Sequence, residues 1–271
     1  MKTWACAALI WAFAGVYAAA EVMRMAVTTS FHNSGLADEL LPEIKRDLNL
    51  DVQLLVVGTG QALRLGRAGD VDAILVHSKT AEEAFVADGF ATHRREIMYN
   101  DFVLVGLMSD PAGISAAASA ADAFLRISAA QARFVSRGDD SGTHKKELGL
   151  WQAAGQDPET FGRWYKSVGA GMGGALNTAS GLSAYILSDR ASWIKFGNKG
   201  DLALLYAGDP GLFNQYAYLP INPAIHSHVK ADQAKKLEDW LASDRARTLI
   251  NAYRFEGEAL FTFNALSLIH I

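Results

Sequence analysis

Hydroxyl side chains cluster where the first predicted strand of this 271-residue chain ends. Thr28, Thr29 and Ser30 directly follow the β-rich run 22–27, and Ser34 stands just before a helical pattern. The first turn of a helix leaves about four backbone N–H groups unpaired, and the helix dipole places about half a positive charge there. Hydroxyls beside such donors predict a cradle for a small anion. The alternative is that Ser30 or Ser34 only caps the helix.

A second turn of the same kind follows the predicted strand 52–57. Its sequence is Gly58-Thr59-Gly60, and glycine lets a backbone approach a ligand closely. It is not a phosphate loop, because the G-x-x-x-x-G-K-[ST] spacing is absent, and by itself it also fits an ordinary tight turn. Since carboxyl ends of parallel strands meet at one edge of a sheet, we expect Thr59 and Gly60 to converge with the first turn.

Arg137 is the one basic residue placed in a turn of this type. It directly follows another predicted strand, and Ser141 and Thr143 lie in the same turn. A guanidinium can donate two hydrogen bonds to one oxyanion. The alternative is a surface ion pair with Asp139 or Asp140, which would contribute little.

Other chemistries have less support in the sequence. The seven histidines show no H-E-x-x-H or comparable ligand spacing, no G-x-S-x-G motif surrounds a serine, and a serine–histidine hydrolase can be assembled only by free choice of residues. The one cysteine, Cys6, lies in the apolar N-terminal segment. The sequence therefore predicts binding rather than turnover, with no cofactor and no metal-cation site.

The elements that must position these turns alternate between strands and helices. This alternation predicts an α/β fold with mostly parallel sheets flanked by helices. The further predicted strands are 72–76, 101–107, 133–136, 201–206 and 215–221, and the predicted helices include 81–87, 231–241 and 245–253.

Two segments suggest that the chain forms two lobes. The turn cluster 109–113 predicts a crossing into a second lobe, and the strand 215–221 is a plausible return. We therefore expect a first lobe made of 21–105 and 215–265, and a second lobe made of 106–214.

The N-terminal segment 1–20 reads as a secretory signal peptide. Met1-Lys2 precedes an apolar run, and Ala18-Ala19-Ala20 provides a cleavage site near Ala20. We therefore expect a periplasmic or secreted protein. The 25 basic and 29 acidic residues are interspersed without a polybasic stretch, which argues against nucleic acid as a partner. We expect a monomer.

Many short motifs, in order, resemble the TupA-type tungstate-binding proteins, which are substrate-binding components of ABC importers. The matching segments are Thr28-Thr29-Ser30, Asn33-Ser34-Gly35-Leu36, Val57-Gly58-Thr59-Gly60-Gln61-Ala62-Leu63, Gly69-Asp70-Val71-Asp72, Leu75-Val76-His77, Met98-Tyr99-Asn100-Asp101-Phe102-Val103, Arg137-Gly138-Asp139-Asp140-Ser141-Gly142-Thr143-His144, Trp164-Tyr165 and Gly171-Met172-Gly173. They span about residues 22 to 262. Two features depart from the family pattern: Val27 replaces the first of three threonines, and the tail 266–271 does not look like the family's end.

The resemblance implies a type II periplasmic-binding-protein fold that holds a dehydrated oxyanion between its two lobes and docks on an ABC permease. The donors it implies are Thr28, Thr29, Ser30, Thr59 with its neighbouring amide, Arg137 and Thr143. A site made only of donors suits a fully deprotonated tetrahedral dianion such as tungstate, because monoprotonated phosphate would also need an acceptor. A molybdate or broader oxyanion receptor, an environmental sensor and an exported serine hydrolase are the alternatives.

Overall fold

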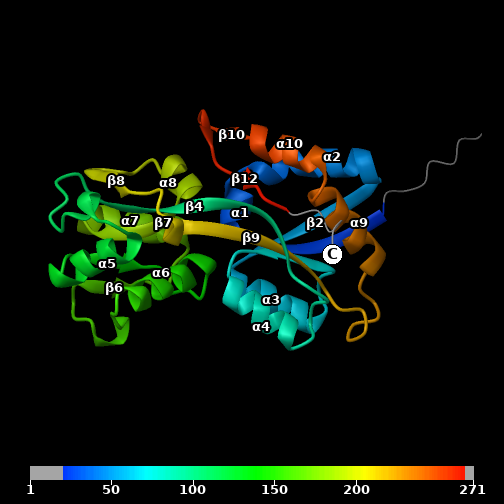
Figure 1. The fold of residues 1–271 in the computed structure, drawn as a ribbon, viewed down its shortest axis with the longest axis horizontal. Helices are drawn as coiled ribbons and strands as arrows, with labels where there is room; N and C mark the ends of the chain where they lie inside the picture. Colours follow the sequence, from blue (N-terminus) through cyan, green and yellow to red (C-terminus); the bar gives the residue numbers. More distant parts are fainter. Residues whose placement is uncertain (1–20, 266–271) are drawn as a thin grey trace, which may run out of the picture.

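Two α/β lobes that share their connecting strands make up the structure (Figure 1). The computed structural model describes residues 21–265. The strand order across the molecule is β2-β1-β3-β9-β4-β7-β5-β6, and β8 and β12 also pair with β4. The strands are β1 (Glu21–Thr28), β2 (Leu50–Val57), β3 (Ala73–Val76), β4 (Arg95–Leu107), β5 (Phe134–Ser136), β6 (Tyr165–Ser167), β7 (Tyr185–Asp189), β8 (Leu202–Tyr206), β9 (Phe213–Pro220), β10 (Arg254–Phe255), β11 (Glu258–Ala259) and β12 (Thr262–Phe263).

The first lobe is built on the parallel strands β1, β2 and β3. Strand β9 lies antiparallel beside β3, and the first half of β4 lies antiparallel beside β9. Successive residues of these strands point to opposite faces of the sheet, and apolar side chains pack on both faces. Its helices are α1 (Thr29–Asn33), α2 (Leu36–Leu48), α3 (Thr59–Ala68), α4 (Lys79–Ala87), α9 (Ala231–Leu241) and α10 (Asp244–Ala252). Helices α2, α9 and α10 cover one face of the sheet, and α3 and α4 cover the other (Figure 1).

The second lobe repeats this plan on the parallel strands β5, β6 and β7. The second half of β4 lies antiparallel beside β7, and β8 pairs antiparallel with β4. Its helices are α5 (Ala120–Ala129), α6 (Gly142–Ala153), α7 (Met172–Leu182) and α8 (Arg190–Lys195). One face packs on an aromatic cluster around Trp151 of α6, whose ring centroid lies 4.5 Å from that of Phe124. The predicted two-lobe α/β fold is confirmed, although the strands that join the lobes make both sheets mixed rather than purely parallel.

The chain crosses between the lobes inside long strands. Residues 95–101 of β4 pair with β9, whereas residues 102–105 of the same strand pair with β7. The turn at 109–113, where the sequence predicts the crossing, lies instead beyond the far end of β4 in the second lobe. A strand of 13 residues is long enough to enter both cores, so no separate linker is needed. We propose lobe boundaries within β4 and at the start of β9, because β9 pairs with β3 and with the first half of β4, whereas Leu212 before it packs in the core of the second lobe.

The predicted signal peptide, including the cleavage site near Ala20, and the tail 266–271 lie outside the described residues. Across residues 21–265, no helix has the length and apolar character needed to cross a membrane.

Candidate anion-binding site

The turn from β1 to α1 places three hydroxyl residues at a helix start. Thr28 is the N-cap of α1, and its Oγ1 accepts the N–H of Phe31 at 3.3 Å. Thr28 and Ser30 are buried, and Thr29 is half-buried. The cap is therefore made by Thr28 at the start of α1, whereas Ser34 lies at its end and donates to the carbonyl of Phe31 at 2.6 Å.

The turn from β2 to α3 leaves a hydroxyl unpaired. Thr59 is the first residue of α3 and is fully buried, yet its Oγ1 has no hydrogen-bond partner in residues 21–265. Gly58, the N-cap, contributes no side chain, so the first amides of α3 also stay open. Such a buried, unpaired group costs about 1–3 kcal/mol unless a ligand or water satisfies it.

Arg137 follows β5 and lies next to the start of α6. It is 5% exposed, its Nη2 pairs with Asp139 Oδ2 at 2.5 Å, and its Nη1 donates to Thr143 Oγ1 at 3.3 Å. Its Nε has no partner within the described part of the chain. Ser141 is the N-cap of α6 and accepts the N–H of His144 at 3.2 Å. The predicted ion pair with Asp139 thus exists, but it is buried and leaves a donor free.

The helix starts of the two lobes lie against each other. A Cβ placed on Gly58 would lie 4.0 Å from Ser141 Cα, and one on Gly142 would lie 2.3 Å from His77 Cε1. Arg64 of α3 also approaches Asp140 at 3.8 Å. The chain is therefore in a closed arrangement, with the start of α3 facing the start of α6.

The structure brings most of the predicted donors to this junction. Six of the predicted residues are buried there, namely Thr28, Ser30, Thr59, Arg137, Ser141 and Thr143. Gly60 lies at the same junction and is half-buried, with the carboxylate of Asp140 against it. Thr29 is the predicted residue whose placement gives the least support, since it is only half-buried and its hydroxyl makes no hydrogen bond to another of residues 21–265.

Two further residues join the site without having been predicted. His77 follows the end of β3 and places Nε2 3.1 Å from Ser30 Oγ, and Tyr216 of β9 places its hydroxyl 3.1 Å from the same atom. Both side chains are buried. His77 could have been found, because it follows a parallel strand as Thr28 and Arg137 do.

The charges at the junction are nearly balanced. Burial, and then the charge of Arg137, lower the pKa of His77 to about 3, so the imidazole is neutral at physiological pH. Burial raises the pKa of Asp139, but hydrogen bonds from Ser141 and the charge of Arg137 outweigh it and leave that pKa lowered. Arg137 and Asp139 therefore form an ionised pair, the exposed side chains of Arg64 and Asp140 add one charge of each sign, and the hydroxyl groups of the junction are neutral.

The contact between Ser30 and His77 does not make a hydrolase site. In a serine–histidine–acid triad, a carboxylate holds the second ring nitrogen of the histidine. No carboxylate holds Nδ1 of His77 in the described residues, and the neighbouring side chain that acts on the ring is the amide of Asn214. The pair thus lacks the orienting group on which nucleophile activation depends.

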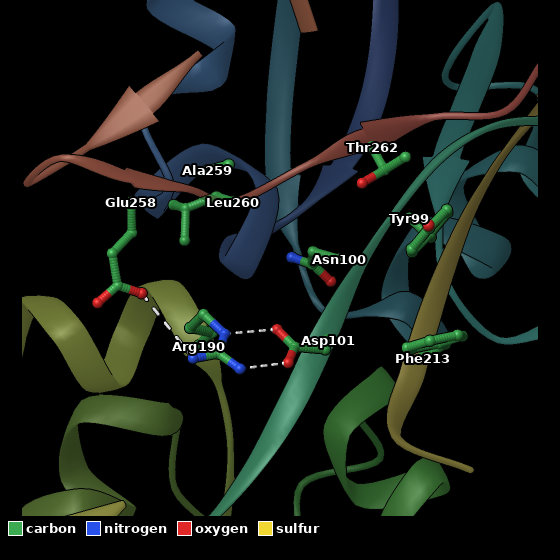
Figure 2. Close-up of a pocket in the computed structure, with 9 residues that line it drawn as sticks. All are labelled: Tyr99, Asn100, Asp101, Arg190, Phe213, Glu258, Ala259, Leu260 and Thr262. Carbon is green, nitrogen blue, oxygen red and sulfur yellow. Dashed lines mark hydrogen bonds and ion pairs between the residues drawn. The ribbon is translucent and has the colours of Figure 1, made fainter. Parts of the chain in front are cut away.

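A cavity of about 390 Å³ is lined by residues of β4, of α8 and of the segment 258–262 (Figure 2). Arg190 of α8 lines it. Its Nε and Nη2 donate to the carboxylate of Asp101 of β4 at 2.7 and 2.5 Å, and Glu258 lies 3.8 Å from its Nη1. Because this guanidinium is already paired, the cavity is poorly suited to an anion. Apart from Asn100 of β4, which also meets Asn214, it shares no residue with the junction described above.

Comparisons with known proteins identify the family of this chain. Residues 15–245 match the family described as the PBP superfamily domain. The chain is 45% identical to the tungstate-binding protein TupA of Peptoclostridium acidaminophilum over 247 residues, which cover 89% of this chain and 85% of that protein. It is similar in structure to the tungstate-binding protein TupA from Desulfovibrio alaskensis G20, with a TM-score of 0.81, 44% identity and coverage of 91% of this chain and 100% of that one. The structure of the tungstate ABC transporter from Geobacter sulfurreducens matches with a TM-score of 0.78, 46% identity and coverage of 87% and 100%.

Proposed function

The chain belongs to the PBP superfamily and, within it, to the family of the TupA tungstate-binding proteins, and from this premise we propose that it captures tungstate between its lobes for an ABC importer. It is a solute-binding protein rather than an enzyme. The proposal covers the ligand, the residues that bind it and delivery to a permease outside the cytoplasm.

The observation that carries the proposal is the pair of unsatisfied buried donors at the junction. Thr59 Oγ1 from the first lobe and Arg137 Nε from the second both lack partners in the described residues. One oxyanion between the starts of α3 and α6 would satisfy both, together with the open amides of those helices. It would also recover the free energy lost by burying them.

The charge balance of the site favours a dianion held by hydrogen bonds. Asp139 already neutralises Arg137, so binding relies on neutral donors and helix starts, as well as on the guanidinium. A fully deprotonated tetrahedral ion accepts at every oxygen and matches such a site. The size of the closed junction would then separate tungstate and molybdate from the smaller sulfate.

The proposed binding site is tested by reversing the charge of Arg137. Calorimetric titration of Arg137→Glu with tungstate should show no measurable binding, since a carboxylate would repel the anion and leave Asp139 without its partner. Arg163→Glu makes the same charge change at an exposed position of the same lobe and should bind as the wild type does. Equal tungstate affinity in the two variants would remove Arg137 from the site.

A further inference from the structure

Three hydroxyl or imidazole groups crowd around a single oxygen in the β1–α1 turn. Ser30 Oγ lies 3.0 Å from Thr28 Oγ1, 3.1 Å from His77 Nε2 and 3.1 Å from the Tyr216 hydroxyl. A hydroxyl donates one hydrogen bond and accepts two. These three neighbours therefore use the whole capacity of Ser30, and no proton of Ser30 remains for a ligand.

One direction of the hydrogen bonds leaves the proton of Thr28 free, and it starts from the neighbours of Thr28. Thr28 Oγ1 accepts the backbone N–H of Phe31, which can only donate. If Thr28 also accepts the proton of Ser30, both of its acceptor positions are filled and its own proton is free. Ser30 must then accept from Tyr216 and from His77, which requires the imidazole proton to sit on Nε2.

On the basis of the function proposed above, we propose that His77 is a positioning residue that directs the hydroxyl proton of Thr28 at the bound oxyanion. The proton order runs from His77 Nε2–H and Tyr216 O–H to Ser30, from Ser30 to Thr28, and from Thr28 to the anion. Thr28 is thus the hydroxyl of this turn that touches the ligand, and Ser30 lies behind it.

The surroundings of His77 suit a neutral donor. Its ring is buried against Tyr216, with ring centroids 4.8 Å apart. It also packs against the start of α6, where the space between Gly142 and the imidazole is too small for a side chain on residue 142. The charged groups that act on it are Arg137 and Lys146, both cationic, and Asn214 is its polar neighbour. Two nearby cations disfavour an imidazolium, as does burial. Tyr216 keeps its proton as well, because burial raises its pKa.

Two substitutions of His77 separate proton direction from packing. His77→Phe keeps a ring of similar size without any donor, and its tungstate Kd should rise at least about tenfold, the loss expected for one hydrogen bond to a charged ligand. His77→Gln restores an N–H near the position of Nε2 and should bind within about threefold of the wild type. Tyr216→Phe removes the second donor and should weaken binding as His77→Phe does.

The control is His32→Phe, which makes the same change at an exposed position of α1 and should leave the Kd unchanged. Wild-type affinity in His77→Phe, or a loss of binding in His77→Gln equal to that in His77→Phe, would overturn the inference while leaving the proposed function intact. If the wild type itself does not bind tungstate, the proposed function fails first.

The tautomer can be measured without any ligand. Two-bond ¹H–¹⁵N correlation spectra of the wild-type protein should show His77 with its proton on Nε2 and an unprotonated Nδ1 across pH 5–8. A proton on Nδ1 would make Nε2 an acceptor from Ser30, reverse the proton order and refute the inference, whatever the affinities of the variants.

Discussion

At the scale of single residues, Thr59 separates binding from stability most cleanly. Its hydroxyl is buried and has no hydrogen-bond partner in the described residues, so a methyl group in its place would stabilise the fold equally well. In Thr59→Val the unfolding free energy should stay equal or rise, because an unsatisfied polar group is removed. The tungstate Kd should rise about tenfold or more. Urea unfolding and calorimetric titration of the same sample check both, and a stability loss with unchanged Kd would contradict the assignment.

Glu147 of α6 predicts a pH-dependent stability. It is buried and accepts hydrogen bonds from Trp151 Nε1 at 3.1 Å and from the Tyr165 hydroxyl at 2.8 Å. Burial raises its pKa from 4.5 to about 7. Between these values the folded chain holds a proton that the unfolded chain releases, so the contribution is full below pH 4.5 and is lost as pH rises to 7. A shift of this size corresponds to about 3 kcal/mol.

Glu147→Gln should remove this loss, because the amide oxygen still accepts both hydrogen bonds but cannot ionise. The variant should gain stability relative to the wild type at pH 8 and much less at pH 5, measured by urea unfolding. Glu159→Gln, at an exposed position, should show no such difference. An equal gain for Glu147→Gln at both pH values would show that the Glu147 carboxyl is not the titrating group.

The donors that sequence alone predicted are those that follow parallel strands, because the strand–turn–helix pattern is local. Thr28, Thr59 and Arg137 were found in this way. His77 has the same position relative to β3, but a single histidine without a second ligand at a regular spacing gives no recognisable motif. Tyr216 could not be predicted, since the pairing of β9 with β3 that brings it to Ser30 is set by tertiary structure.

At the scale of elements, the start of α6 must approach the first lobe without a side chain in between. A Cβ on Gly142 would lie within 3.0 Å of three ring atoms of His77, which is buried and held by Ser30. Gly142→Ala should therefore hinder closure and raise the tungstate Kd about tenfold or more, while the unfolding free energy of the ligand-free protein changes little.

Gly149→Ala is the matched control on the same helix, because nothing lies within 4 Å of the added methyl group. It should bind normally and gain up to about 1 kcal/mol of stability from helix propensity. Calorimetric titration of both variants distinguishes the two effects. Normal binding by Gly142→Ala would mean that α6 does not close on His77 when the anion binds.

The elements of the first lobe were easier to predict than those of the second. Strands β1, β2 and β3 follow one another with clear turns, and the predicted helices 231–241 and 245–253 match α9 and α10 within one residue. In the second lobe, β6 has three residues and α7 is rich in glycine and alanine, so neither shows a strong periodic pattern. The crossing was misplaced because β4 continues through both sheets without any local signal.

At the scale of the whole molecule, the proposed site predicts that binding and closure are one event. The donors come from both lobes, and β4 and β9 connect them. Helix α8 also contacts both hydrophobic cores, with Ala191 in the core of the first lobe and Trp193 in that of the second. We infer that opening the junction bends these shared segments, and that the anion stabilises the closed state by bridging donors that otherwise remain unpaired.

Titration of the protein with tungstate, molybdate, sulfate and phosphate in one calorimetric series tests this account most directly. Tungstate should bind one ion per chain, with molybdate as its nearest competitor. Sulfate should bind far more weakly because it is smaller, and phosphate because it carries a proton that the site cannot accept. Absence of tungstate binding, or phosphate binding as tight as that of tungstate, would contradict the account.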